Sequence, residues 1–260
     1  VSSAASDVYK RQISHSGFAV ELENHIFLFD YYKGEIPKFD PKKSIVVFAS
    51  HVHHDHYVEE IFELREQYPD VHYVLSSDIR RSAKKILEEK QIEAQVSFLR
   101  IHQELELGKV RIQTLKSTDA GVAFLVECEG RTIYHAGDLN WWHWEGEPDA
   151  YNEHMKMAYL KEIEKLKDTP IDVAFVPVDP RLGEQYYYGI DGFAKRVDAK
   201  ALIPMHCWGD YTVCEKLMHQ EETKEYRERI YPITKEGEEI CLKICLLYTS
   251  PSPRDISGSR

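Results

Sequence analysis

The chain has 260 residues, of which 33 are basic and 44 acidic, so its formal net charge is −11. Hydrophobic residues make up 43% and charged residues 30%, a balance that supplies a folded core and excludes wholesale disorder. No run of about 18 apolar residues occurs, which predicts that no helix spans a membrane. The acidic balance argues against nucleic-acid binding over a broad surface.

Short apolar runs dominate the N-terminal part of the chain. Residues 18–22 and 25–29, joined by Glu23 and Asn24, predict a β-hairpin. Residues 44–49 form a continuous β-branched run that is typical of a buried strand. We expect a helix over 59–67, a strand over 71–75 and a helix over 79–90, with Asp78 as its N-cap.

The rest of the chain alternates between predicted strands and helices. Strands are expected over 96–101, 109–115, 122–128 and 132–136, then over 173–178 and 201–205. Helices are expected over 152–167, 192–197 and 211–227. These elements form two loosely similar halves without a low-complexity linker. We therefore expect one domain of stacked sheets covered by helices.

Both ends of the chain resemble a translated sequencing adapter. One short DNA element, read on opposite strands, can encode residues 7–12 and residues 245–250. We therefore expect the folded domain to span residues 13–244, with adapter-derived tails over 1–12 and 245–260. The cysteines outside these tails form no CxxC pair, which favours a reduced, cytoplasmic protein.

A run of metal-ligand residue types follows the strand predicted at 44–49. Five of the six residues 51–56, which read HVHHDH, are histidine or aspartate. Imidazole and carboxylate groups together suit zinc, manganese or iron. His51 and His53 can point one way from a strand-to-helix turn, while Asp55 and His56 reach a second point nearby. The position after a buried strand favours a metal site over a His-rich surface loop.

This HxHxDH pattern resembles the signature of the metallo-β-lactamase superfamily. Two later motifs match the family in order and context: YHAGD, which ends at Asp138, and IPMH, which ends at His206. The opening HSGF, which begins at His15, resembles the first strand of the lactonase-like and phosphodiesterase-like branch. The resemblance implies an α+β fold, an αββα sandwich of two facing mixed sheets with helices on the outer faces.

The resemblance also implies ligand roles and a reaction. The implied metal ligands are His51 and His53 for a first metal, Asp55, His56 and His206 for a second, and Asp138 as the bridge. The cofactor would be one or two zinc ions, with manganese or iron as alternatives. Zinc lowers the pKa of bound water from ~15.7 to about 7, so a metal-bound hydroxide would attack a lactone, ester or phosphodiester. Asp55 and Asp138 would be the catalytic carboxylates.

The sequence departs from the family pattern at one place. The family usually has another histidine between the signature and the bridging aspartate, but residues 114–121 contain none. Asp119 or His143 could replace it, or Lys116 could supply positive charge beside a single metal. We therefore expect one strong metal site and one that is weaker or absent. The alternative function is a non-catalytic metal- or ligand-binding protein of the same fold.

Several residues are expected to surround the metal site. The candidate substrate-binding residues are Trp141, Arg181, Tyr187 and Trp208. Their aromatic rings could line a pocket for an acyl chain or a sugar ring, or could only pack the loops. The Arg181 guanidinium could pair with a phosphate or carboxylate, or form a surface salt bridge. We expect a small-molecule substrate, and we expect Asp30 to orient a ligand histidine.

Overall fold

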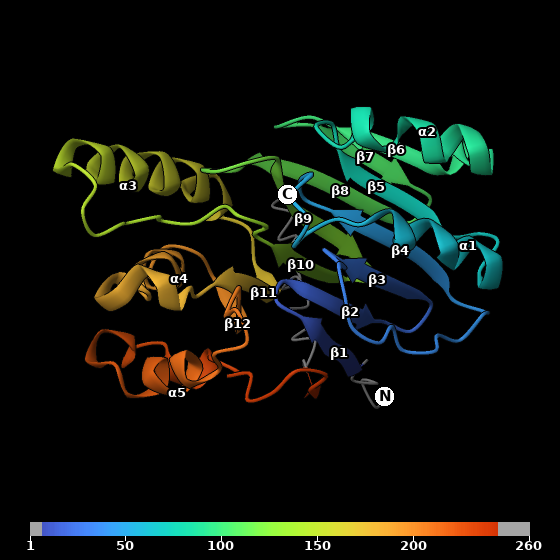
Figure 1. Cartoon of the computed structure of the whole chain (residues 1–260). Coiled ribbons are helices and arrows are strands. Elements are labelled where there is room, and N and C mark those ends of the chain that lie inside the picture. The colour runs from blue at the N-terminus through green and yellow to red at the C-terminus, as the bar shows by residue number, and fades with distance from the viewer. Residues whose placement is uncertain (1–6, 244–260) are drawn as a thin grey trace, which may run out of the picture.

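The computed structural model describes residues 7–243, whose strands form two β-sheets (Figure 1). One sheet has seven strands in the order β13-β1-β2-β3-β4-β5-β6, and the other has six in the order β12-β11-β10-β9-β8-β7. No helix among these residues is long and apolar enough to cross a membrane.

The bounds of the strands follow the chain. The first sheet contains β1 (Asp7–Ser14), β2 (Gly17–Glu21), β3 (His25–Phe29), β4 (Ser44–Ala49), β5 (His72–Ser76), β6 (Val96–Leu99) and β13 (Glu239–Lys243). The second contains β7 (Glu104–Leu107), β8 (Val110–Lys116), β9 (Val122–Cys128), β10 (Arg131–His135), β11 (Ile171–Pro177) and β12 (Ala199–Met205). Each sheet is mixed, because β3 to β6 and β10 to β12 are parallel while the other pairs are antiparallel.

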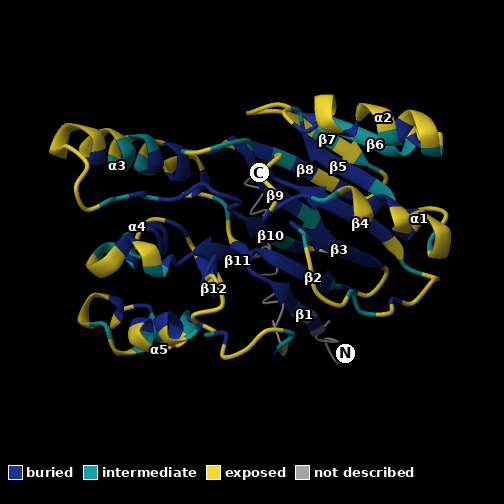
Figure 2. Ribbon diagram, viewed as in Figure 1, coloured by how far each residue is buried: buried dark blue, intermediate teal, exposed yellow. Residues whose placement is uncertain are grey.

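Helices cover the outer face of each sheet. They are α1 (Leu64–Gln67), α2 (Arg80–Lys90), α3 (Asp149–Ile163), α4 (Tyr188–Ala194) and α5 (Thr212–His219). Figure 1 shows α1 and α2 beside the first sheet and α3, α4 and α5 beside the second. Their outward residues are exposed while the strands between them are largely buried (Figure 2). The predicted αββα sandwich is therefore confirmed.

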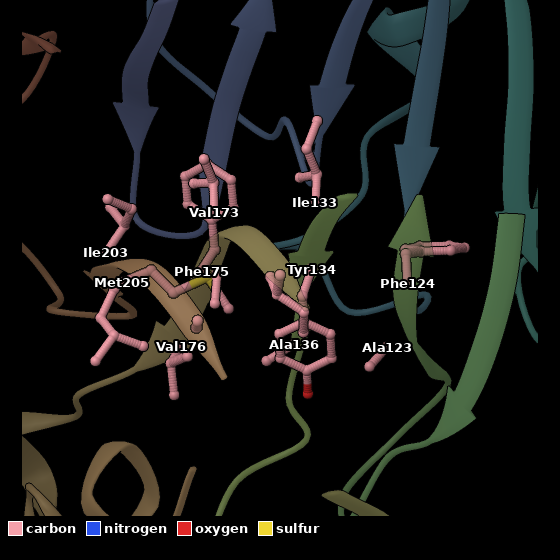
Figure 3. Close-up of a cluster of buried hydrophobic side chains, with 14 of the residues drawn as sticks. Ala123, Phe124, Ile133, Tyr134, Ala136, Val173, Phe175, Val176, Ile203 and Met205 are labelled. Carbon is pink, nitrogen blue, oxygen red and sulfur yellow. The ribbon is translucent and has the colours of Figure 1, made fainter. Parts of the chain in front are cut away.

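The core lies between the two sheets and under the helices. Phe18 on β2 contacts Phe175 on β11, with ring centroids 4.4 Å apart, and Phe48 on β4 lies 5.1 Å from Phe124 on β9. Figure 3 shows Phe124 and Phe175 among the buried side chains of the second sheet. On the opposite face of that sheet, Tyr134 stacks on Phe193 of α4. Burial of each such aromatic ring stabilises the fold by roughly 1.5–3 kcal/mol.

Four details of the fold differ from the sequence-based expectations. The predicted domain boundary at residue 13 lies inside β1, which begins at Asp7 and pairs with both β2 and β13. Short strands β7 and β13 were not predicted. Asp78 does not cap α2, because its carboxylate accepts a hydrogen bond from the backbone N–H of Val52. The helices predicted over 152–167 and 211–227 end early and continue as 3-10 turns.

The structure also bears on the expectations about the chain ends and the cysteines. Residues 1–6 and 244–260, which include half of the first predicted tail and all of the second, lie outside the described residues. The adapter origin of the tails stays a prediction. The four described cysteines, Cys128, Cys207, Cys214 and Cys241, are free.

Candidate metal centre

Loops from the carboxyl ends of three strands and from one hairpin turn meet at one end of the sandwich. The loop after β4 carries residues 50–56, the loop after β10 carries Asp138, and His206 follows β12. His15 lies in the turn between β1 and β2. Open parallel sheets commonly place ligands at the carboxyl ends of their strands, where such loops gather.

The metal-ligand side chains fall into two clusters. The inner cluster consists of His15, Asp55, His56 and His206, all buried. The outer cluster consists of His51, His53 and Asp138, of which His53 is exposed. Within each cluster the candidate ligand atoms all lie within 4.8 Å of one another.

Asp138 stands between the two clusters. Its Oδ1 lies 3.1 Å from Nε2 of His56 and 3.3 Å from Nε2 of His206. Its Oδ2 lies 3.4 Å from Nε2 of His51. One carboxylate oxygen therefore faces each cluster, which is the arrangement of a bridging ligand.

The buried polar atoms at the centre of the site have no hydrogen-bond partner. They are Nδ1 and Nε2 of His15, Nε2 of His51, His56 and His206, and Oδ1 of Asp138. Leaving a buried donor or acceptor unsatisfied costs about 1–3 kcal/mol, so such a concentration requires an explanation. Nitrogen and carboxylate oxygen atoms that converge in this way fit a divalent metal of the zinc, manganese or iron group.

The opposite nitrogen of three imidazoles is held by a second residue. Nδ1 of His56 lies 2.7 Å from Asp30 Oδ2, and Nδ1 of His206 lies 2.9 Å from Asp179 Oδ2. Nδ1 of His51 lies 2.9 Å from the Ser50 hydroxyl. These contacts leave each Nε2 facing the site, as second residues around metal ligands commonly do. Asp30 thus contacts a candidate ligand histidine, as expected.

Burial and charge shift the pKa values of these groups in opposite directions. Burial lowers the pKa of His15 and of His51 to about 4 each, which favours the neutral imidazole that binds metals. Burial alone would raise the pKa of Asp138, but the charge of His56 and the proximity of His206 bring it well below its usual range. Asp138 therefore stays a carboxylate at neutral pH.

The surroundings of His56 and His206 instead favour the protonated imidazole. Burial opposes their protonation, yet the Asp138 carboxylate raises the pKa of His56 and of His206 above the usual histidine value. Asp179 is itself buried, and its contacts with His206 and Arg181 lower its pKa to about 2. The centre is thus an anionic pocket that favours a cation.

Two glycines allow the loops to approach one another. Gly121 has a φ of 66°, and a Cβ there would lie 2.0 Å from the Ser50 carbonyl oxygen and 2.5 Å from Cβ of His51. Gly137 has a φ of 52°, and a Cβ there would lie 2.7 Å from Cβ of Ser50. Only glycine fits at these positions, which place His51 and Asp138 side by side.

The structure brings together all six ligands implied by the resemblance and adds a seventh residue. The sequence analysis quoted His15 only as part of the HSGF motif and gave it no ligand role. Its Nε2 lies 3.4 Å from Asp55 Oδ2, and its ring centroid lies 4.0 Å from that of His206. One feature of the sequence could have identified His15. It follows the first strand, and the other candidate ligands also follow strands.

The two proposed replacement ligands do not join either cluster of the described residues. Asp119 is exposed, although burial and the nearby Asp138 raise its pKa. His143 packs its ring against Tyr188, with centroids 5.4 Å apart. Replacement of the absent histidine by Asp119 or His143 therefore stays a prediction.

The expected substrate-binding residues separate into two pairs. Trp208 is 42% exposed, and its ring lies 4.5 Å from His15 and 4.5 Å from the Arg181 guanidinium. Arg181 donates to both oxygens of Asp179, which connects it to His206. Trp141 instead contacts Tyr188, and Tyr187 packs between Tyr186 and Tyr188. Trp142 is the tryptophan of that loop whose ring faces His206, at 5.5 Å.

A family model described as a beta-lactamase superfamily domain matches residues 11–206, which is more than half of the chain. No curated protein matches the chain.

Solved structures share the fold at low identity. Igni18, a metallo hydrolase from Ignicoccus hospitalis, is 15% identical, with a TM-score of 0.60 over 92% of this chain and 100% of that one. YhfI, a metallo-beta-lactamase fold protein from Bacillus subtilis, is 16% identical, with a TM-score of 0.58 over 91% and 99%. CmlA, a diiron beta-hydroxylase from Streptomyces venezuelae, is 12% identical, with a TM-score of 0.58 over 94% and 55%.

These structural likenesses show a common architecture, which in CmlA serves a different reaction from that of Igni18. The family match rests on the sequence itself and covers the strands and loops that carry both clusters. The chain therefore belongs to the beta-lactamase superfamily.

Proposed function

We propose that this protein is a metal-dependent hydrolase that acts on a lactone, an ester or a phosphodiester. The observation that carries the proposal is the convergence of unpartnered Nε2 atoms and the Asp138 carboxylate at the loop end of the sandwich. A metal bound there would polarise the substrate and activate a water molecule as the nucleophile.

Different residues of the chain would bind such a metal and orient its ligands. His15, Asp55, His56 and His206 would bind it in the inner cluster, and Asp138 would link that cluster to His51 and His53. Asp30 and Asp179 accept from Nδ1 of their histidines and so direct each Nε2 towards the site. Asp55 and Asp138 carry the negative charge that compensates the cation.

The substrate would enter beside Trp208 and Arg181. The Trp208 ring offers an exposed apolar face next to His15, and the Arg181 guanidinium lies over that ring. This pair suits a small molecule with an apolar portion and a polar or anionic portion.

The test combines metal analysis with a substrate panel. The purified chain should contain zinc, manganese or iron by mass spectrometry, and a chelator should abolish its turnover of a lactone, of 4-nitrophenyl acetate or of bis(4-nitrophenyl) phosphate. Metal-free protein without chelator-sensitive turnover of any of the three would refute the proposal.

A non-catalytic metal-binding protein is the second candidate, favoured by the exposed His53 and the absence of a third histidine in the outer cluster. Substitution Asp55→Ala separates the two candidates. Lost turnover in a variant that still folds supports the enzyme. A lower melting temperature in a protein that never had turnover supports the binder.

A further inference from the structure

One edge of the first sheet is open. β6 pairs with β5 in parallel, with Val96 opposite Tyr73 and Phe98 opposite Leu75, and no strand within residues 7–243 pairs with its other side. An open edge presents backbone N–H and C=O groups that can pair with another extended chain. β6 is also the strand next to α2 in Figure 1.

A groove runs along this edge between β6 and α2. Its apolar floor consists of Leu87, Val96 and Phe98, and its volume is about 680 Å³. A second hollow of about 460 Å³ continues it beyond the end of β6 and shares Ser77, Arg80 and Phe98 with the first. Val96 and Phe98 are only half-buried, because α2 packs over β5 and leaves the edge strand partly uncovered.

The groove is basic on an acidic protein. Arg80, Arg81 and Lys84 line the first hollow, and Arg100 lines the second. The Arg80 guanidinium lies 4.5 Å over the Phe98 ring, which holds it at the junction of the two hollows. Within the described residues the guanidinium groups of Arg80, Arg81 and Arg100 form no ion pair.

Acidic residues lie at the other end of the groove. Glu88 and Glu93 line the part near the start of β6, and Glu88 already pairs with Lys84 at 3.8 Å. The unpaired positive charge is therefore concentrated near the carboxyl end of β6. On a chain with a net charge of −11, this local excess favours an acidic partner.

We propose that this groove binds an acidic, extended peptide segment of a partner protein, which adds a strand to β6. Backbone hydrogen bonds to the open edge would give affinity, and alternate side chains would enter the groove over Val96 and Phe98. Carboxylates of the peptide would pair with Arg80, Arg81 and Arg100. This surface is separate from the metal centre and does not depend on the proposed hydrolase activity.

The length of the edge limits the peptide. β6 has four residues, which at about 3.3 Å per residue span about 13 Å. The paired stretch of the peptide therefore has about four to six residues, and the side chains on its groove-facing side should carry the carboxylates.

Fluorescence anisotropy with the full chain tests the proposal. The probe is a fluorescein-labelled peptide Glu-Val-Glu-Val-Glu-Val-Glu, which should bind saturably, whereas its Lys-Val counterpart should not. The double variant Arg80→Glu and Arg81→Glu should weaken binding by about tenfold or more. The matched control is Lys85→Glu, which reverses a charge on the same helix at a residue that does not line the groove and pairs with Glu89.

Two further measurements distinguish strand addition from simple charge attraction. A peptide with N-methyl groups at alternate backbone positions should lose binding, and the bound peptide should slow amide hydrogen exchange in Val96–Leu99. Equal binding of the N-methyl peptide, or equal weakening by Lys85→Glu, would overturn the proposal. Occupation of the groove by a second copy of this chain, seen as a dimer that Arg80→Glu dissociates, would also overturn the proposal. Tighter binding of a single-stranded oligonucleotide than of the peptide would do the same.

Discussion

The inner and outer clusters use the same residue types but differ in how firmly the fold holds them. The inner His56 and His206 each contact a buried carboxylate, Asp30 or Asp179, through Nδ1. In the outer cluster, Nδ1 of His51 contacts the Ser50 hydroxyl instead of a carboxylate, and the side chain of His53 is exposed and forms no hydrogen bond within the described residues. The inner cluster is therefore preorganised, whereas the outer cluster must order His53 when it binds.

This difference gives a physical reason for two metal affinities in one site. A carboxylate behind a ligand imidazole fixes its orientation and raises its basicity, and its loss commonly weakens metal binding by about 10–100-fold. Ordering an exposed side chain opposes binding through lost rotamer freedom. We therefore expect a tight inner metal and a weak outer metal.

Substitution Asp138→Asn is expected to have the largest effect, because one carboxylate serves both clusters. Loss of its charge should remove the outer metal, weaken the inner one and reduce kcat/KM by about a thousandfold or more. Metal content and steady-state rates measure the two effects. An inner metal retained with full affinity would show that Asp138 belongs to the outer cluster alone.

Stepwise chelation should separate the clusters directly. Titration of the metal-loaded chain with a chelator should release one equivalent at least about tenfold more readily than the second. Metal content after each step gives the stoichiometry. A His53→Ala variant should lose the first phase and keep the second, and two equivalents released together in the unsubstituted chain would contradict the asymmetry.

Substitution Asp179→Asn should weaken the inner metal by about 10–100-fold, because His206 would lose the carboxylate at its Nδ1. Asp172→Asn is the matched control. Asp172 lies on β11 of the same sheet and is also buried, but it contacts Arg131, Thr132 and Lys200 rather than a candidate metal ligand. Isothermal titration with zinc should show the loss in the first variant and not in the control.

Substitution Gly121→Ala should disturb the outer cluster through sterics alone. Its Cβ would collide with Ser50 and His51, which adds about 1–3 kcal/mol of overpacking to the strain of a positive φ. Gly130→Ala has the same kind of φ, 69°, with no atom within 4 Å of its Cβ. Thermal unfolding should therefore show a clearly lower Tm for Gly121→Ala than for Gly130→Ala. An equal decrease in Tm would mean that the loop around residue 121 moves to accommodate the methyl group.

The apolar pattern of the sequence predicted layered sheets, and its resemblance to a known family implied a set of candidate ligands. Buried strands such as SIVVFA have continuous apolar runs, and ligands that follow such strands must gather where the strands end. The resemblance of HVHHDH, YHAGD and IPMH to the family motifs implied a set of residues that the structure places within a few ångströms of one another.

The features that the sequence did not predict depend on partners distant in the chain. His15 joins the inner cluster only because the β1–β2 turn packs against the loop of His206, whose backbone N–H donates to the His15 carbonyl. The sequence analysis did not identify Asp179, since nothing local shows that it contacts His206. Strands β7 (ELEL) and β13 (EICLK) are too short to give a clear pattern, and they form by pairing with β8 and β1. The choice between Trp141 and Trp142 depends on side-chain direction within one loop.

Substitution Trp208→Ala is expected to have the smallest effect and to leave both clusters intact. Trp208 is 42% exposed, so its removal should change stability little, and it contacts His15 and His206 by ring packing without binding a metal. If it lines the substrate entrance, KM should rise several-fold while metal content and Tm stay near those of the unsubstituted chain. A fall in metal content would instead mean that the ring holds His15 in place, and the inner cluster would owe part of its order to an exposed side chain.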